Sequence, residues 1–286
     1  MSRPSPSPLA GIRDILVGTA VEGEREEASS AIGYGLTLAK AAGAHLTVQS
    51  ASWRLSGDDA WLGEFDYEGV SVVDRRLDEL ARSIAERSAG DAAQAGVVCT
   101  TEAPSLPYPE IVSRLATRAR LYDLTVLDIG PRTYDLDREM VEKALFHSGR
   151  PVIAVPPGRD AFVARRIIVA WDGSAQAARA ANDALPFLRS AEAVEIVSVG
   201  TEAEIHEAVP GAEFAPHLAR HGVNVSVNDL PERDSVADTL RVQAGLFRAD
   251  MIVMGAYRHS PTREYFFGGV TRSFLRGSPA ALFLSR

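Results

Sequence analysis

Cysteine is nearly absent from this chain of 286 residues. Its single cysteine, Cys99, excludes an internal disulfide and any metal site built from several cysteines. Cys99 lies in a predicted strand, where a small buried apolar residue is the expected role. Lysine is almost as scarce, because Lys40 and Lys143 are the only two. A Walker phosphate loop and a protein kinase site each need a lysine, so residues 159–286 contain neither.

Long apolar runs are also missing. No stretch approaches the roughly 18 apolar residues of a membrane-spanning helix, so we expect no membrane association. Residues 1–11, MSRPSPSPLAG, are polar and proline-rich and lack the apolar core of a signal peptide. These absences lead us to expect a cytoplasmic protein. The formal charge of −8 argues against nucleic acid as a partner.

The chain shows no set of an acid, a base and a nucleophile. It lacks the GxSxG nucleophile elbow, the HExxH zinc motif and the SGGxDS loop of ATP pyrophosphatases. His217 and His221 share one face of a predicted helix, but no third ligand is near them in the sequence. We therefore predict no catalytic residues and no metal site.

An internal repeat organises the sequence. SGRPVIAV at residues 148–155 aligns with SPAALFLS at 278–285, and DLTVLDIG at 123–130 aligns with DMIVMGA from Asp250. Strands and helices alternate in the same order in both halves. This alternation predicts parallel sheets with right-handed crossovers, and hence an α/β fold class.

We expect two tandem doubly wound, Rossmann-like domains at residues 1–158 and 159–286, joined by a tether at 156–165. In the first half the expected strands are 14–19, 45–51, 97–102, 124–129 and 151–155, and the expected helices are 24–42, 71–95, 109–122 and 137–147. In the second half the expected strands are 166–170, 193–200, 223–229, 251–254 and 281–285, and the expected helices are 175–189, 202–221, 235–248 and 270–276.

The stretch from Asp250 to Arg286 has the residues best suited to ligand chemistry. Gly255 follows a buried strand, and the pair Gly268 and Gly269 precedes a short helix. Glycine lets the backbone turn sharply and approach a ligand, and a helix amino terminus attracts an anion. Between Gly255 and Gly277 one acid, Glu264, stands against four arginines: Arg258, Arg263, Arg272 and Arg276. This stretch suits a phosphate group.

These residues resemble the nucleotide loop of the universal stress protein family, which has the form GxxGx9G followed by Gly, Ser or Thr. Gly255, the nine residues 259–267, and Gly268 with Gly269 fit this form, and MGAYRHS at its start is typical of the family. The resemblance is specific in residues 250–286 and weaker in the first half. It implies an adenine nucleotide alpha hydrolase-like fold and a cytoplasmic stress-response or regulatory protein that binds ATP, with or without Mg²⁺.

The resemblance also implies site residues, carried over by position. They are Asp172 after the first strand, Val199 ending the second strand, Met254, Gly255, Gly268 and Gly269 around the fourth loop, and Thr271 as a hydroxyl donor. In an open α/β sheet such residues meet beyond the carboxyl ends of the strands, where the strand order reverses. Asp172 has an alternative role as a helix cap, and Gly268 and Gly269 have one as turn residues.

One position departs from the family pattern, because Arg258 stands where the second glycine is expected. Arg258 either pairs with a phosphate or fills the space that the phosphate needs. The first alternative is an adenine nucleotide-binding protein with one site in the second half. The second is a scaffold that binds no nucleotide and acts through an unidentified protein partner. Slow ATP hydrolysis is a third alternative.

The first half lacks the features of this site. No acid follows Gly18 and Thr19 where Asp172 stands in the second half, and Asp135, Asp137 and Glu139 lie near the start of a predicted helix. Carboxylates there satisfy the helix dipole from within the chain. The first half carries 16 basic and 23 acidic side chains, against 14 and 15 in the second. We therefore expect no nucleotide in the first half.

Domains of the resembled family commonly pair through their last strands. Residues 151–155 and 281–285 would then form an internal pseudo-dimer, and a homodimer is a further arrangement that the resemblance allows. The apolar ALFL ending would otherwise be an exposed sheet edge.

A long loop at residues 52–69 carries several aromatic residues among acids: Trp53, Trp61, Phe65 and Tyr67. A loop of this length is either a lid or a partner surface, or its aromatic side chains pack it onto its own domain.

Overall fold

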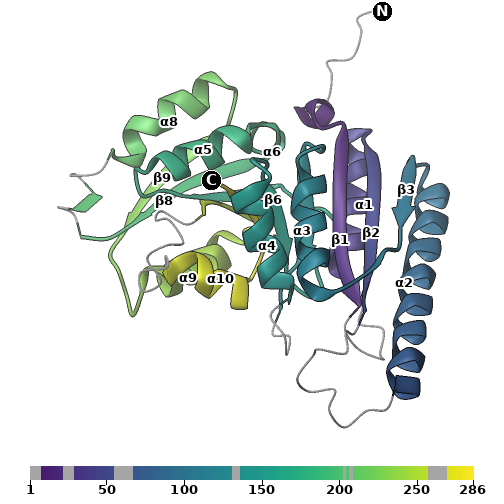
Figure 1. The fold of residues 1–286 in the computed structure, drawn as a ribbon. Helices are drawn as coiled ribbons and strands as arrows, with labels where there is room; N and C mark the ends of the chain where they lie inside the picture. Colours follow the sequence, from purple (N-terminus) through teal and green to yellow (C-terminus); the bar gives the residue numbers. More distant parts are fainter. Residues whose placement is uncertain are drawn as a thin grey trace, which may run out of the picture.

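A computed structural model describes residues 8–21, 29–54, 67–130, 136–201, 204–205, 209–256 and 269–286. These residues form one 11-stranded sheet that runs through the molecule, with helices packed against both faces (Figure 1). The strand order is β3-β2-β1-β5-β6-β11-β10-β7-β8-β9, and the short β4 pairs with β2. Every neighbouring pair is parallel except β6 and β11. The predicted α/β fold class is confirmed.

The strands of the first half are β1 (Asp14–Val21), β2 (His45–Trp53), β3 (Cys99–Glu102), β4 (Ser105–Leu106), β5 (Leu124–Asp128) and β6 (Val152–Val155). Those of the second half are β7 (Arg166–Ala170), β8 (Ala193–Val199), β9 (Val225–Leu230), β10 (Met251–Gly255) and β11 (Ala281–Ser285). The helices are η1 (Pro8–Gly11), α1 (Ser30–Ala42), α2 (Tyr67–Ala95), α3 (Tyr108–Ala119), α4 (Leu136–His147), α5 (Ala175–Asp183), α6 (Leu185–Ser190), α8 (Gly211–Arg220), α9 (Val236–Phe247) and α10 (Gly269–Arg276).

Most elements lie where the sequence predicts them. The loop expected at 52–69 is shorter than predicted, because β2 extends to Trp53 and α2 begins at Tyr67 rather than at residue 71. Two other exceptions have local causes. The helix expected at 175–189 is divided into α5 and α6, because Pro186 has no amide hydrogen with which to continue the first helix. The helix expected from residue 24 begins at Ser30, where the Ser29 hydroxyl accepts a hydrogen bond from the Ile32 amide. Of the helix expected at 202–221, the described part is mainly α8.

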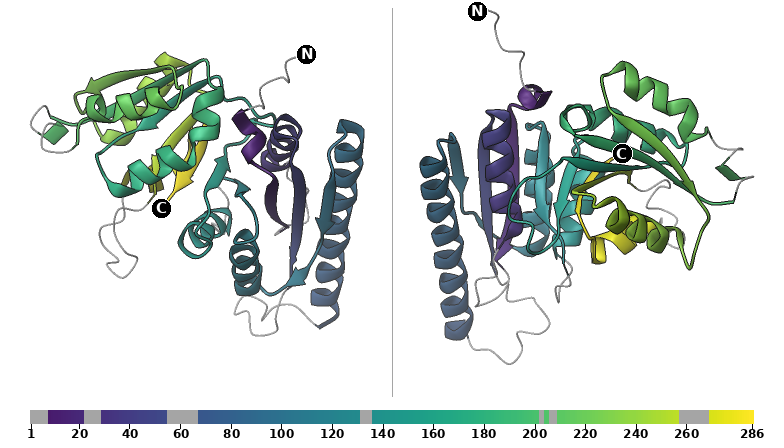
Figure 2. Two further views of the ribbon diagram at one scale, coloured as in Figure 1. Left: turned by 90° about the horizontal axis from the view of Figure 1, so that it is seen from above. Right: turned by 180° about the vertical axis from the view of Figure 1, so that it is seen from behind.

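Each face of the sheet carries its own apolar layer. One layer joins α1, α5, α6 and α8 to the sheet, and the other joins α3, α4, α9 and α10 to it. Helix α2 lies along the β2 and β3 end of the sheet (Figure 2). Because both faces are covered, every residue of β5 and of β11 is buried. None of the described helices is long and apolar enough to cross a membrane.

The two halves meet at the centre of the sheet, where β6 and β11 run antiparallel. These are the strands that the sequence analysis expected to pair. Ile153 lies opposite Phe283, and the pairs on either side of it are Val152 with Leu284 and Ala154 with Leu282. All six of these side chains are fully buried. The last strand of each half is therefore an interior strand rather than an exposed edge.

The same main-chain anchor recurs in both halves. In the first half, Asp123 Oδ2 accepts hydrogen bonds from the amides of Arg13 and Asp14, at 2.7 and 3.0 Å. In the second half, Asp250 Oδ2 accepts from the amides of Arg165 and Arg166, both at 3.0 Å. Asp123 thus ties the start of β5 to the start of β1, and Asp250 ties the start of β10 to the start of β7. A second recurring contact is a serine before the last strand: Ser148 accepts from Arg150, and Ser278 accepts from Ala280.

Residues 156–165 connect the halves and are fastened to α1. The Ser30 hydroxyl donates to Asp160 Oδ1 at 2.6 Å, and the Phe162 amide donates to Thr37 Oγ1 at 2.7 Å. The tether passes close to Gly33 of α1. A Cβ at this position would lie 2.5 Å from the carbonyl oxygen of Asp160, so only glycine leaves room for the tether.

An aromatic chain then continues from α1 into the second half. It consists of Tyr34, Phe162, Phe187 and Phe283, with ring centroids 5.5 to 5.9 Å apart. The tether is thus part of the core that joins the halves.

The paired aspartates give a matched test of the repeated anchor. Asp250→Ala removes the acceptor of two backbone amides, so we expect the free energy of unfolding to fall by about 1–2 kcal/mol. Asp123→Ala should cost a similar amount, because its geometry is the same. Urea denaturation of both variants measures these changes, and a loss in only one of them would contradict the equivalence of the two anchors.

Candidate functional site

The strand order reverses between β10 and β7. From β7 the chain proceeds to β8 on one side, while β10 lies on the other side. Met254 lies opposite Ala170, which in turn lies opposite Val197, so the carboxyl ends of β10, β7 and β8 are side by side. Ligands of open α/β sheets bind at such a reversal. The structure therefore brings the segments of Asp172, Val199 and Gly255 to one edge, where the sequence analysis placed the site.

A tight turn leads from β7 into α5. Asp172 Oδ1 accepts a hydrogen bond from the Ser174 amide at 3.0 Å, and Gly173 has a φ of 69°, in the left-handed region that favours glycine. Ser174 is the helix cap, since its hydroxyl accepts from the Ala177 amide at 3.1 Å. Asp172 thus braces the turn and is not the cap. Its side chain is exposed at the edge of the sheet.

Gly255 has a packing role that the sequence analysis did not foresee. A Cβ at this position would lie 2.6 Å from the amide nitrogen of Ala177 and from the carbonyl carbon of Gln176. These are main-chain atoms of the first turn of α5, which a side chain cannot displace cheaply. The absence of a side chain lets the positive amino terminus of α5 approach the end of β10 closely.

Val199 and Met254 supply apolar surface at the same edge. Val199 is partly buried and Met254 is buried, and both belong to the apolar layer of α9 and α10. Trp171 belongs to the opposite layer. Its ring stacks on Phe214 with centroids 4.2 Å apart, and its Nε1 donates to the Val209 carbonyl at 2.7 Å. Trp171 therefore fastens the segment before α8 to the turn that carries Asp172.

Helix α10 begins at Gly269, which is exposed, and Thr271 is buried in its first turn. Arg241 of α9 fixes this helix. Its Nη2 donates to the carbonyl and hydroxyl of Ser273, at 2.8 and 2.6 Å, and its guanidinium lies 4.9 Å from the centre of the Phe274 ring. Two further predicted site residues, Arg258 and Gly268, lie outside the described residues.

Sequence reasoning missed a carboxylate at this edge, Glu204. Its Oε2 accepts hydrogen bonds from the Thr201 amide and hydroxyl, both at 2.8 Å, and lies 3.2 Å from where a Cβ of Gly200 would be. These two hydrogen bonds lower the pKa of Glu204, because they favour its ionised form. The signal in the sequence was Thr-x-x-Glu, a capping-box pattern directly after β8.

Other residues singled out in the sequence are not part of this edge. Trp53 ends β2 and is buried, with its ring edge against Tyr108 at 5.7 Å, so it packs onto its own half. Trp61 and Phe65 lie outside the described residues. His217 Nε2 is 3.1 Å from Asn182 Oδ1, and the His217 and His221 rings are 4.7 Å apart. In the described part of the chain no three metal-ligating side chains form a group.

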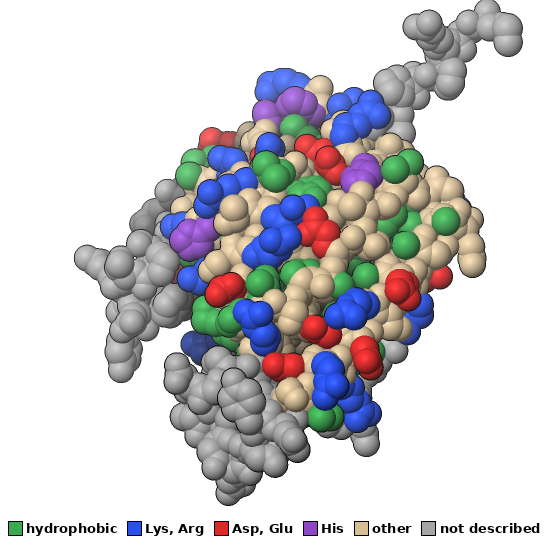
Figure 3. All heavy atoms as spheres, turned by 45° about the vertical axis from the view of Figure 1, so that its right-hand side comes forward, with side chains coloured by type: hydrophobic (Ala, Val, Ile, Leu, Met, Phe, Trp, Pro, Cys, Tyr) green, Lys and Arg blue, Asp and Glu red, His purple; other side chains and the backbone are tan. Residues whose placement is uncertain are grey.

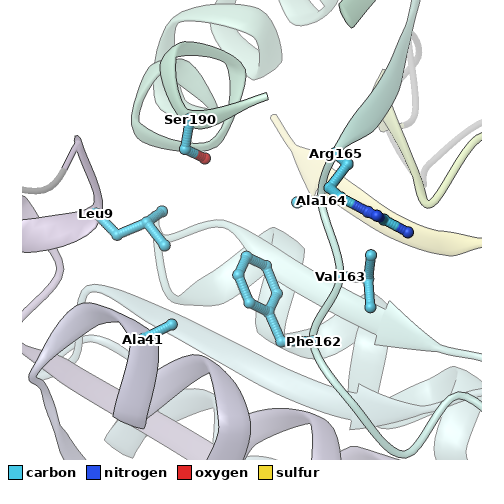
Figure 4. A pocket seen from close by; sticks show the side chains of 7 residues that line it. All are labelled: Leu9, Ala41, Phe162, Val163, Ala164, Arg165 and Ser190. Atoms are coloured by element: carbon cyan, nitrogen blue, oxygen red, sulfur yellow. The ribbon is translucent and has the colours of Figure 1, made fainter. Parts of the chain in front are cut away.

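A depression of about 460 Å³ opens on the other edge of the sheet (Figure 4). It is lined by Leu9, Ala41, Phe162, Val163, Ala164, Arg165 and Ser190. These residues precede strands or end helices, so the depression lies at the amino ends of the strands. It is therefore separate from the candidate site. On the face drawn in Figure 3, basic and acidic side chains of the described residues are interspersed.

The packing at Gly255 predicts a position-specific effect of alanine. Gly255→Ala would force the first turn of α5 away from β10, and we expect the free energy of unfolding to fall by about 1–3 kcal/mol. At Gly269, no described atom lies within 4 Å of the place that a Cβ would take, so Gly269→Ala should leave stability nearly unchanged. Urea denaturation distinguishes the two, and equal effects would contradict the close approach of α5.

The contacts of Glu204 predict its titration. Thr201→Val removes the hydroxyl donor and keeps the amide donor. The pKa of Glu204 should then rise toward its ordinary value, because the ionised form loses one hydrogen bond. Carboxyl NMR of the full chain across the acidic range measures this pKa, and an unchanged value in the variant would show that the hydroxyl does not stabilise the carboxylate.

Comparisons with known proteins bear on the family and on the fold. A model of the universal stress protein family matches residues 164–286. No curated protein matches the chain. Among solved structures, a universal stress protein from Archaeoglobus fulgidus DSM 4304 is similar, with a TM-score of 0.71 and 17% identity over 96% of this chain and 98% of that chain.

Two structures from Pseudomonas aeruginosa are also similar. A protein from strain UCBPP-PA14 has a TM-score of 0.62 and 14% identity, over 97% of this chain and 94% of that chain. A functionally unknown protein from strain PAO1 has a TM-score of 0.60 and 16% identity, over 97% and 93%. At such identities the likeness shows the fold. Residues 164–286 are therefore a universal stress protein domain, within a chain whose full length has the fold seen in universal stress proteins.

Proposed function

We propose that this chain is a cytoplasmic stress-response protein of the tandem universal stress protein type, which binds one adenine nucleotide, ATP, in its second domain. The domains span residues 1–158 and 159–286 and form an internal pseudo-dimer through β6 and β11. The observation that carries the proposal is that the strands leading to Asp172, Val199 and Gly255 end side by side where the strand order reverses. An unidentified protein partner, with or without homodimer formation, would respond to the bound state.

The chemistry of the edge suggests how a nucleotide would lie. An exposed carboxylate such as Asp172 accepts hydrogen bonds from hydroxyl or amino groups and repels phosphate, so it suits the nucleoside end. Val199 and Met254 offer apolar contact to a base. The phosphates suit the start of α10, where Gly269 is exposed and amide hydrogens have no partner within the helix. Mg²⁺ would enter with the nucleotide, on its phosphate oxygens.

One cation on α10 supports this orientation. Arg272 is exposed in the first turn of this helix, whereas Arg276 lies in its last turn. Asp172 and Glu204 supply negative charge on the β7 and β8 side. This arrangement would put acids at the nucleoside end and one cation, Arg272, at the phosphate end. We propose a binding role, with ATP left intact.

A charge placed at Gly269 tests this site without disturbing the fold. Gly269→Asp puts a carboxylate at the start of α10, where it would repel phosphate, so we expect ATP affinity to fall tenfold or more, which corresponds to about 1.4 kcal/mol. Gly269→Ala is the matched control, because its Cβ meets no described atom within 4 Å, and it should bind ATP within a few-fold of the parent. Isothermal titration calorimetry measures both.

The same titration separates the alternatives. Binding of ATP by the parent chain and by Gly269→Ala, but not by Gly269→Asp, supports the proposal. A parent chain that ignores ATP while Arg258→Gly binds it would show that Arg258 closes the site, and the chain would then be a scaffold. If bound ATP is converted to ADP during a long incubation with Mg²⁺, the protein hydrolyses its ligand, and the proposal that it only binds ATP is contradicted.

A further inference from the structure

Strand pairing identifies the residue of the first half that corresponds to Gly255. In the second half, Ala170 pairs with Met254, and the next residue, Gly255, lies opposite Ser285. In the first half, Gly18 pairs with Leu127, and the next residue, Asp128, lies opposite Val155. The carboxyl end of β10 therefore carries glycine, and the carboxyl end of its counterpart β5 carries aspartate.

The Asp128 carboxylate is buried at the amino terminus of α1. Its Oδ2 accepts from the Ser29 hydroxyl at 2.6 Å, and its Oδ1 accepts from the Ala31 amide at 2.9 Å. Only 8% of Asp128 is exposed. A helix amino terminus favours negative charge, since its first amides have no partner within the helix. Asp128 supplies that charge from within the chain.

The helix positions explain why only one half has room for this side chain. In the second half α5 begins at Ala175, soon after β7 ends at Ala170, and its first turn reaches the main chain of β10. In the first half α1 begins at Ser30, well after β1 ends at Val21. In this arrangement the Asp128 side chain lies between the end of β5 and the start of α1.

We propose that Asp128 is an internal ligand: its carboxylate occupies, at the amino terminus of α1, the place that an anionic group would take, and so closes the first half to anions. The closure itself is a property of the first half alone. It is distinct from the acids near the start of α4, which the sequence analysis identified.

Removal of the carboxylate tests the closure by anion rescue. In Asp128→Ala the Ser29 hydroxyl and the Ala31 amide lose their acceptor, so the melting temperature should fall by about 4 °C or more. Formate or inorganic phosphate should then bind in the vacated place and raise the melting temperature of this variant, compared with chloride at equal ionic strength. Asp128→Asn is the matched control, because its side chain still fills the place, and it should show no such rescue.

Equilibrium dialysis with labelled phosphate gives a second measurement on the same full-length chains. Asp128→Ala should bind one more phosphate per chain than the parent and than Asp128→Asn. Three results would each overturn the proposal. Chloride could raise the melting temperature of Asp128→Ala as much as formate or phosphate does, or these anions could raise that of the parent equally. Dialysis could also show that Asp128→Ala binds no more phosphate than the parent. If Asp128→Ala does not fold, Asp128→Ser is used in the same comparison, since serine leaves most of the place empty.

These outcomes are independent of the function proposed for the second half. A parent chain that binds no ATP, together with anion rescue of Asp128→Ala, would leave the closure intact and overturn the nucleotide proposal. If the parent chain binds ATP but formate and phosphate do not stabilise Asp128→Ala, the nucleotide proposal stands and the closure proposal is overturned.

Discussion

The antiparallel contact between β6 and β11 determines how the rest of this molecule is arranged. It joins the last strands of the two halves, whose facing side chains are fully buried, into the centre of one sheet. Both apolar layers then run across this contact from one half into the other. The tether adds to it through Phe162, which lies in the aromatic chain from Tyr34 to Phe283. The shared sheet and core therefore fix the position of the first-half strands relative to the second-half strands.

Much of this fold could be predicted from the sequence, because the signals are local. Strands alternating with helices indicated the α/β class, and the resemblance to the universal stress protein family indicated that residues 151–155 and 281–285 would pair. The divided helix at Pro186 was missed although proline is a local signal, because the apolar pattern continues across it. The cap at Ser29 was missed because the acids before it resemble the start of a helix.

The candidate site was predictable in outline and not in its contacts. The positions of Asp172, Val199 and Gly255 follow from the strand order, and the structure brings them to one edge. The reason for Gly255 could not be read from the sequence, since it depends on how closely α5 approaches β10. Asp128 was overlooked for a similar reason. Its role depends on the start of α1, which is far from it in the sequence and near it in space.

The central claim is that the two halves share a fold while only the second binds a nucleotide. The most direct measurement is the amount of ATP bound per chain, by release and mass spectrometry of copurified ligand and by titration of the stripped protein. The account predicts one ATP per chain, with the nucleotide lost in Gly269→Asp. Two nucleotides per chain, or one that persists in Gly269→Asp, would contradict it.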